Sequence, residues 1–210
     1  EKWYNKATLK GYENEWLGIP QGVFMQEGDP NYYGGYSALN TAGGETTPAI
    51  LMTAAEVWFL RAEAALRGFS NETPKTCYET DRKPSDYKEM VPASGGKDMK
   101  ALITISPKWN DTAGKEGQLE QIITQKWLAC WPESYEAWSE QRRTGYPKLF
   151  KVQTNNSGGT IDTNDMIRRL PFSTDDADKD PVQYDLLKKA LGGPDHGGTR
   201  LWWDAGKNNF

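Results

Sequence analysis

The chain has 210 residues, of which 37% are hydrophobic and 26% are charged, so it can form a packed core. Its net charge of −4 argues against a nucleic-acid partner, because phosphate backbones are bound by concentrated lysine and arginine. No apolar run approaches the roughly 18 residues that a membrane-spanning helix needs.

Residues 1–46 are predicted to form long ordered loops. Glycine, proline, asparagine and tyrosine recur there without a sustained helical or strand period, and glycine and proline mark turns. The stretch NYYGGY, residues 31–36, places three tyrosines beside two glycines. Binding residues are disproportionately found in such loops.

The stretch PAILMTAAEVWFLRAEAALR, residues 48–67, predicts the first long helix. Its proline suits a first helical turn. Apolar residues recur at helical spacing and form one stripe, which consists of Leu51, Ala55, Trp58, Ala62 and Ala65 or Leu66. Gly68 is expected to end this helix in the left-handed conformation.

Residues 69–117 are polar and broken by glycine and proline, which favours loop. The sequence CYETDRKPSDY, residues 77–87, passes from a helix start directly into loop, so no complete helix is recognisable after Gly68. Residues 101–109, ALITISPKW, are a candidate short strand.

Residues 118–145 are predicted to form two further helices. The run QLEQIITQKWLACW, residues 118–131, has a broad apolar face, Pro132 interrupts it, and a new helix then runs to Gly145. Trp127, Trp131 and Trp138 lie beside isoleucine and alanine on these faces. These tryptophans are therefore interpreted as core and helix–helix seam rather than as a ligand-binding surface.

Lys126 falls on the apolar face of the helix at 118–131, where a lysine is unusual. A buried ammonium group needs a carboxylate partner, or its side chain must extend to water. Glu56 and Glu63 flank the apolar stripe of the earlier helix on one side. They are the expected partners of Lys126 in a structural ion pair, with Glu63 preferred.

Residues 146–210 are predicted to combine loops with one helix, PVQYDLLKKAL, residues 181–191. Asp176, Asp178 and Asp180 alternate like the start of a calcium-binding loop. Pro181 and Leu187 occupy the positions where such a loop needs its turn glycine and its bidentate glutamate. A solvated turn is therefore the preferred interpretation.

The sequence shows little catalytic equipment. Its single histidine, His196, lies in a glycine-rich loop, and the chain has no nucleophile-elbow, phosphate-binding or dinucleotide-binding motif. Cys77 and Cys130 lack the spacing of a zinc site, and packing of Cys130 within its helix is favoured over a disulfide. No enzyme activity, cofactor or metal is therefore expected, with a glycoside hydrolase as the enzymatic alternative.

Three segments in the same order resemble the SusD/RagB family of outer-membrane nutrient-binding lipoproteins. They are LMTAAEVWFLRAEAALRG at 51–68, LEQIITQKWLACWPESYEAWSEQRRTGYP at 119–147 and GGPDHGGTRLWWD at 192–204. The stretch LGIPQG at 17–22 also fits. The resemblance covers most of residues 15–210 and is weakest between 69 and 100.

The resemblance implies a mainly α fold, SusD-like, with TPR-like helical hairpins and long ordered loops. Residues 1–210 would be the C-terminal part of a single SusD-like domain. Its ligand side would be residues 1–46, its TPR-like helices 47–68 and 118–145, and its C-terminal loops and helix 146–210. Family members are about twice as long, so the N-terminal half of the fold is an expected partner, without which residues 1–210 would expose a large apolar interface.

The resemblance also implies a non-enzymatic protein that delivers a nutrient to a SusC-like TonB-dependent transporter. The ligand would be an oligosaccharide or, in some members, a peptide. The protein would lie on the surface of the outer membrane, anchored by a lipidated N-terminal cysteine that is not present in this chain. A TPR-like protein–protein scaffold without a small-molecule ligand is the alternative.

Ligand contacts are expected from the loops rather than from the helical tryptophans. Tyr32, Tyr33, Tyr36 and Trp16 are the candidate ligand-binding residues, because an aromatic ring can stack on a sugar face. The glycines beside the tyrosines would let backbone groups approach ligand hydroxyls. Local packing within the loop is the competing interpretation.

Overall fold

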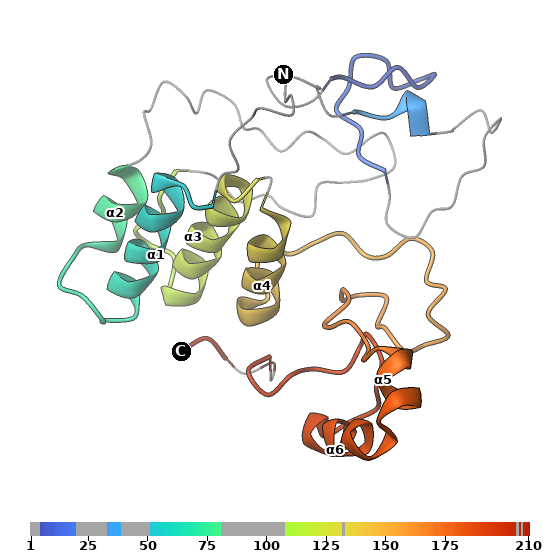
Figure 1. Cartoon of the computed structure of the whole chain (residues 1–210). Coiled ribbons are helices and arrows are strands. Elements are labelled where there is room, and N and C mark those ends of the chain that lie inside the picture. The colour runs from blue at the N-terminus through green and yellow to red at the C-terminus, as the bar shows by residue number, and fades with distance from the viewer. Residues whose placement is uncertain are drawn as a thin grey trace. The chain divides into compact units, whose positions relative to one another are not determined.

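The computed structural model describes residues 5–19, 33–38, 51–80, 108–131, 133–204, 206 and 208–210 (Figure 1). Within these residues every regular element is a helix, so the mainly α prediction is confirmed. The chain divides into two compact units. The helical unit contains the described residues up to Leu149 together with Asn208–Phe210, and the C-terminal unit is Phe150–Lys207. None of the described helices is both long and apolar enough to cross a membrane.

The first long helix, α1 (Ala54–Leu66), begins later than predicted. Its N-cap is Thr53, whose hydroxyl accepts the Glu56 N–H at 3.2 Å and so satisfies a free donor of the first turn. Leu51, which the predicted stripe included, therefore precedes the helix and is exposed. After the other end of α1, Gly68 has a φ of 81°, the left-handed conformation that the sequence predicted.

A short helix, α2 (Pro74–Thr80), follows α1 in the region that was predicted to be loop. Seven residues make only two turns, which is too short for an apolar repeat to be detected. The helix nevertheless packs against α1 and buries Cys77 and Tyr78, so the loop prediction is wrong here. Of the candidate strand at 101–109, residues 101–107 lie outside the described part of the chain, and 108–109 are not in a strand.

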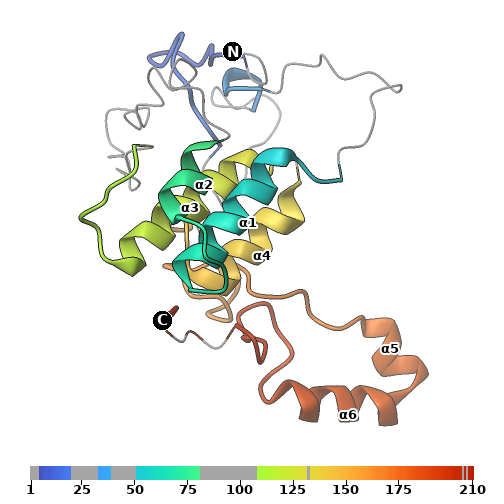
Figure 2. The same cartoon turned by 90° about the vertical axis from the view of Figure 1, so that its left-hand side faces the viewer.

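The second helical pair consists of α3 (Lys115–Ala129) and α4 (Ser134–Thr144), in the region where two helices were predicted. Cys130 caps the end of α3 instead of lying within the helix. Gly145 ends α4 with a φ of 78°, as expected for a left-handed cap. Because α1 packs against α2 and α3, and α3 packs against α4, these helices form two neighbouring hairpins (Figures 1 and 2).

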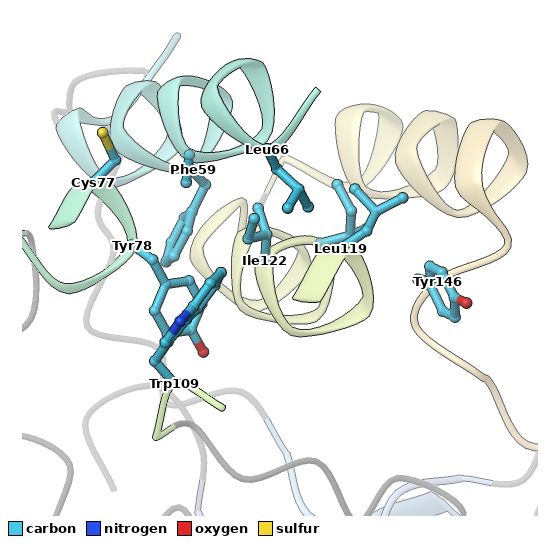
Figure 3. Packing of buried hydrophobic residues seen from close by; sticks show 10 residues of the cluster. Phe59, Leu66, Cys77, Tyr78, Trp109, Leu119, Ile122 and Tyr146 are labelled. Carbon is cyan, nitrogen blue, oxygen red and sulfur yellow. The ribbon is translucent and has the colours of Figure 1, made fainter. Parts of the chain in front are cut away.

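Tyr78 is a fully buried member of the core of the helical unit and packs against two other aromatic rings (Figure 3). The ring of Phe59 meets it edge-on at 5.9 Å, and the ring of Trp109 is tilted against it at 5.0 Å between centroids. Aromatic pairs of this kind contribute about 0.5 to 1.5 kcal/mol beyond their buried area. The other buried members of the core are Ala62, Leu66, Cys77, Leu119, Ile122, Ile123 and Tyr146.

Trp127, Trp131 and Trp138 lie outside this core, and none of the three is buried. The buried apolar residues of α3 are Leu119, Ile122 and Ile123, and the only one of the three tryptophans on this helix, Trp127, is half-buried. Trp131 is 40% exposed, and the Arg142 guanidinium carbon lies 3.6 Å from the centroid of the Trp138 ring. The prediction that these tryptophans belong to the core is therefore wrong, whereas a helix–helix seam position of the half-buried Trp127 and Trp138 stays a prediction.

Cys77 and Cys130 are both free and buried, so the disulfide alternative does not hold. Burial raises the pKa of both thiols, and the pKa of Cys130 reaches about 11. A thiol with a raised pKa is a poor nucleophile at neutral pH, which fits a packing role.

The C-terminal unit contains α5 (Thr174–Lys179) and α6 (Pro181–Leu191), which pack against each other. The bounds of α6 are those predicted. The Asp180 side chain caps α6 by accepting the Gln183 N–H at 3.0 Å, and Asp178 lies within α5. Asp176 and Asp178 thus lie in α5 and Asp180 caps α6, so the prediction of a solvated turn is wrong for the first two. Among the described residues no group of side chains could hold a metal ion.

Residues 208–210 return to the helical unit and contact three of its elements. The Asn209 carbonyl accepts from Arg67 Nη1 at 2.6 Å, which ties it to the end of α1. The Asn209 amide donates to Glu116 Oε1 at 2.6 Å and to the Thr144 carbonyl at 3.1 Å, at α3 and α4. The Arg67 guanidinium also lies 5.0 Å from the centroid of the Phe210 ring.

Candidate functional site

Three short segments of the N-terminal region, residues 5–9, 14–17 and 35–38, are joined by hydrogen bonds; we call them the loop platform. The Thr8 and Leu9 N–H groups both donate to the Gly35 carbonyl at 2.9 Å. The Ala7 N–H donates to the Glu15 carbonyl, also at 2.9 Å. The backbone of these loops is thus ordered by contacts between segments far apart in the sequence.

Gly35 permits the closest of these contacts. A Cβ atom at this position would lie 3.0 Å from Leu9 Cδ1 and 3.3 Å from Leu9 Cα, closer than ordinary side-chain packing allows. A larger residue would therefore push the first segment away. One glycine of NYYGGY thus serves backbone packing within the platform.

The loop platform brings two of the candidate aromatic residues onto neighbouring segments. The Ser37 N–H donates to the Leu17 carbonyl, and the Leu17 N–H donates to Ser37 Oγ, both at 2.9 Å. Trp16 and Tyr36 each precede one member of this pair. Trp16 is 40% exposed and Tyr36 is half-buried, so the platform presents aromatic surface to solvent.

The side chains of the remaining two candidates lie outside the described part of the structure. Tyr32 lies outside the described residues, and the described backbone of Tyr33 begins the short helix η1 (Tyr33–Gly35). A residue that the sequence did not single out, Lys6, has its Nζ 5.9 Å from the centroid of the Trp16 ring. Only the pairing of segments 5–9 and 14–17 brings this lysine to the ring, so no local sequence pattern could have indicated it.

Lys126 lies in a group of carboxylates contributed by α1 and α4. Its side chain is 1% exposed, and its Nζ is 2.6 Å from Glu136 Oε1, 2.8 Å from Glu140 Oε1 and 4.0 Å from Glu56 Oε1. Burial alone would lower the pKa of this lysine, but the Glu140 and Glu136 carboxylates outweigh burial and raise it. The charged ammonium group therefore links α3 with α4 and approaches α1.

Glu63, the preferred predicted partner of Lys126, pairs with arginines instead. Its Oε1 accepts from Arg67 Nε and Arg143 Nη1, and its Oε2 accepts from Arg143 Nη2, all at 2.7 Å. Glu56 and Glu63 are two helical turns apart, about 10 Å, so one ammonium group cannot bind both. The preference for Glu63 is wrong, and the acids of α4 are the nearest partners of Lys126.

The spacing of the acids on α4 could have indicated these partners. Glu136 and Glu140 are four residues apart and therefore share one face of that helix. A short connection after α3 makes α4 an adjacent helix of the same hairpin. The acids that follow the lysine in the sequence were thus better candidates than those on α1.

The pairs between Glu63 and the two arginines should make the protein sensitive to acid. Burial opposes ionisation of Glu63, but hydrogen bonds from Arg143 and Arg67 outweigh it and lower the pKa of Glu63 below the ordinary 4.5. A carboxyl group with a lowered folded pKa stabilises the fold above its unfolded pKa, and this stabilisation is lost as the pH falls through the folded value. Urea unfolding should show an acid-dependent loss of stability that is smaller in Glu63→Gln.

The matched control for Glu63→Gln is Glu133→Gln, which alters an exposed carboxyl group just before α4. Glu133→Gln should have the same free energy of unfolding as the wild type at about pH 7, and should lose as much of it toward about pH 3. The same pH profile in the wild type and in Glu63→Gln would contradict the expected role of Glu63.

His196 makes contacts within its own loop. Its Nδ1 accepts the Gly198 N–H at 3.2 Å and lies 3.4 Å from Thr199 Oγ1. The Gly198 backbone in turn approaches Thr160 so closely that a Cβ at position 198 would overlap the Thr160 carbonyl. These contacts give the histidine a structural part in a tightly packed glycine-rich loop.

A family model matches nearly the whole chain. It describes SusD-like proteins, the SusD and RagB outer membrane lipoproteins, and it matches residues 1–81 and 79–204. A search of curated proteins finds no match to this chain.

Solved structures show the same relationship. A SusD homologue from Bacteroides vulgatus is 58% identical with a TM-score of 0.86, and the match covers 99% of this chain and 46% of that protein. A chitin-binding SusD homologue from Flavobacterium johnsoniae is 32% identical with a TM-score of 0.82, covering 100% and 46%. A SusD homologue from Bacteroides thetaiotaomicron is 31% identical with a TM-score of 0.82, covering 99% and 48%.

The chain spans about half the length of these solved relatives. The resemblance carried by its three sequence segments is confirmed by the family model and by the shared fold. The chain therefore belongs to the SusD-like family of SusD and RagB outer membrane lipoproteins.

Proposed function

We propose that the protein is a non-enzymatic cell-surface binding protein that captures an oligosaccharide for uptake through a SusC-like TonB-dependent transporter. A lipidated N-terminal cysteine outside residues 1–210 would hold it at the outer membrane. Membership of a family of outer membrane lipoproteins supports this proposal, as does the description of one relative as chitin-binding. A peptide is the alternative ligand.

The observation that best supports a binding role is the arrangement of Trp16, Tyr36 and Lys6 in the loop platform. A pyranose ring has an apolar face of C–H groups and a rim of hydroxyls. The exposed Trp16 ring complements the apolar face, and the Lys6 ammonium group beside it can donate hydrogen bonds to hydroxyls. Binding sites for small ligands typically combine an aromatic or apolar surface with a small number of polar groups.

Replacing Trp16 with alanine should weaken oligosaccharide binding by about 1 to 2 kcal/mol, or about five- to thirty-fold in Kd. The loss follows from removing the exposed ring, while the backbone hydrogen bonds that build the platform are kept. Calorimetry with soluble chitin, malto- and xylo-hexasaccharides measures the effect. Product analysis of the same mixtures tests for cleavage.

The matched control is Trp131→Ala, which removes an equally exposed indole, 40% in both cases, just after α3. This control should leave Kd unchanged. Equal affinities for the wild type, Trp16→Ala and Tyr36→Ala would refute the assignment of the platform. Binding of peptides alone would reject the oligosaccharide ligand, cleavage would favour a hydrolase, and the absence of any small ligand would favour a protein–protein scaffold.

A further inference from the structure

Trp202 and Trp203 occupy the corner of a turn in the C-terminal unit, and Trp202 is 90% exposed. The Asp204 N–H donates to the Leu201 carbonyl at 2.9 Å and closes this turn over residues 201–204, the Trp202 turn. Glycine, proline, asparagine, aspartate and serine are the usual turn residues, because their backbone or side chains suit the geometry. An exposed indole adds nothing to that geometry, so the turn itself does not require Trp202.

An ion cluster of two arginines and two aspartates fixes the end of the Trp202 turn. Asp204 is buried and accepts from Arg168 Nε at 2.7 Å and from Arg200 Nη1 at 2.8 Å. Asp165 accepts from Arg168 Nη1 at 2.8 Å and from Arg200 Nη2 at 2.9 Å. Each carboxylate thus bridges both guanidinium groups, and this network holds the residues on both sides of the two tryptophans.

The chemistry of this surface fits a sugar ring. Trp202 offers a flat apolar face. Arg200, which directly precedes the turn, and its ion-pair partner Asp165 are both partly exposed and supply charged hydrogen-bonding groups. Because the cluster already orders these groups, binding would cost little further side-chain entropy.

We propose that the Trp202 turn is a second saccharide-binding subsite, with Trp202 as the stacking residue and Arg200 as its polar neighbour. This inference rests on the proposed function, because it takes an oligosaccharide as the ligand. It adds a binding element in the C-terminal unit, at a distance of more than 160 residues in the sequence from the loop platform at 5–38.

Fluorine NMR of the protein labelled with 5-fluorotryptophan tests the subsite directly. The resonance that Trp202→Phe removes belongs to Trp202, and the probes are the soluble chitin, malto- and xylo-hexasaccharides. We expect this resonance to shift on titration with the hexasaccharide that the wild type binds. Trp202→Ala should weaken that binding about tenfold, and Trp202→Phe should restore part of it, because a smaller ring still stacks.

The control is Phe69→Ala, which removes another highly exposed aromatic ring from the helical unit and should leave affinity unchanged. The melting temperature of Trp202→Ala should equal that of the wild type, which separates lost binding from lost folding. Binding that depends on Trp16 while the Trp202 resonance and the Trp202→Ala affinity stay unchanged would overturn the subsite and leave the proposed function intact. No binding of any hexasaccharide to the wild type would overturn both.

Discussion

Replacing Lys126 with methionine is expected to destabilise the protein by about 3 to 5 kcal/mol. The substitution keeps most of the side-chain volume but removes the ammonium group that lies within 2.8 Å of Glu136 and Glu140 and 4.0 Å from Glu56. Glu140 and Glu56 are buried, so Glu140 would retain only its pair with Arg143 and Glu56 would lose the ammonium group near it. Urea unfolding at neutral pH measures the loss.

The matched control for Lys126→Met is Lys179→Met, which breaks the pair with Asp175 on the exposed surface of α5. Exposed pairs of this kind contribute about 0 to 1 kcal/mol, so the control should change stability little. The double variant Lys126→Met with Glu140→Gln should recover part of the loss, because it removes one of the stranded charges. Similar stabilities of Lys126→Met and Lys179→Met would show that the buried cluster does not stabilise the fold.

Replacing Tyr78 with alanine is expected to cost about 3 to 5 kcal/mol, the range for truncating a large aromatic side chain in a core. Tyr78 is fully buried and lies between the rings of Phe59 and Trp109 (Figure 3). Its removal leaves a cavity where α2 meets α1, and both neighbouring rings lose their contact. Chemical denaturation should show a lower midpoint with an unchanged slope.

The matched control for Tyr78→Ala is Tyr135→Ala, because Tyr135 is 77% exposed on α4. A surface change of this kind is expected to stay within about 0.5 kcal/mol. Tyr78→Phe separates the ring from the hydroxyl group and should retain most of the stability, since the ring supplies the packing. If Tyr78→Ala lowered the free energy of unfolding by less than about 1 kcal/mol, the packing role of this ring in the core would be contradicted.

The sequence predicted the helices that are long or clearly punctuated. An apolar repeat over several turns revealed α1 and α3, and proline and glycine marked the ends of α6. The same repeat could not reveal α2, because two turns contain too few repeated positions. The start of α1 was also misplaced, since the cap at Thr53 decides it and a proline upstream was the stronger local signal.

Helical periodicity identifies an apolar face but not the side chains that fill its centre. Trp127, Trp131 and Trp138 were assigned to the core because they share faces with isoleucine and alanine. The buried core instead combines apolar residues of α1 and α3 with Tyr78 from the short helix and Trp109 from a loop. Those two rings reach the core through tertiary contacts, which leave no periodic signal in the sequence.

The candidate site was predictable in residue type and not in geometry. Aromatic residues in loops were predicted to bind the ligand; of these, Trp16 is exposed and Tyr36 is half-buried, and their binding role stays a prediction. Their adjacency depends on the hydrogen bonds between Leu17 and Ser37, twenty residues apart, and Lys6 joins them through a further pairing. The Trp202 turn likewise depends on a contact between residues distant in the sequence, because the paired Arg168 and Asp204 are 36 residues apart.

The contacts of Asn209 can form only after the helices that they join have been synthesised. The chain emerges from its N-terminus, so α1, α3 and α4 are made long before their partner. Arg67 precedes Asn209 by 142 residues and Glu116 precedes it by 93 residues. Before residue 209 is translated, Arg67 can already pair with Glu63 and Glu116 can already accept from Tyr146, so Asn209 adds its contacts to side chains that the helical unit has ordered.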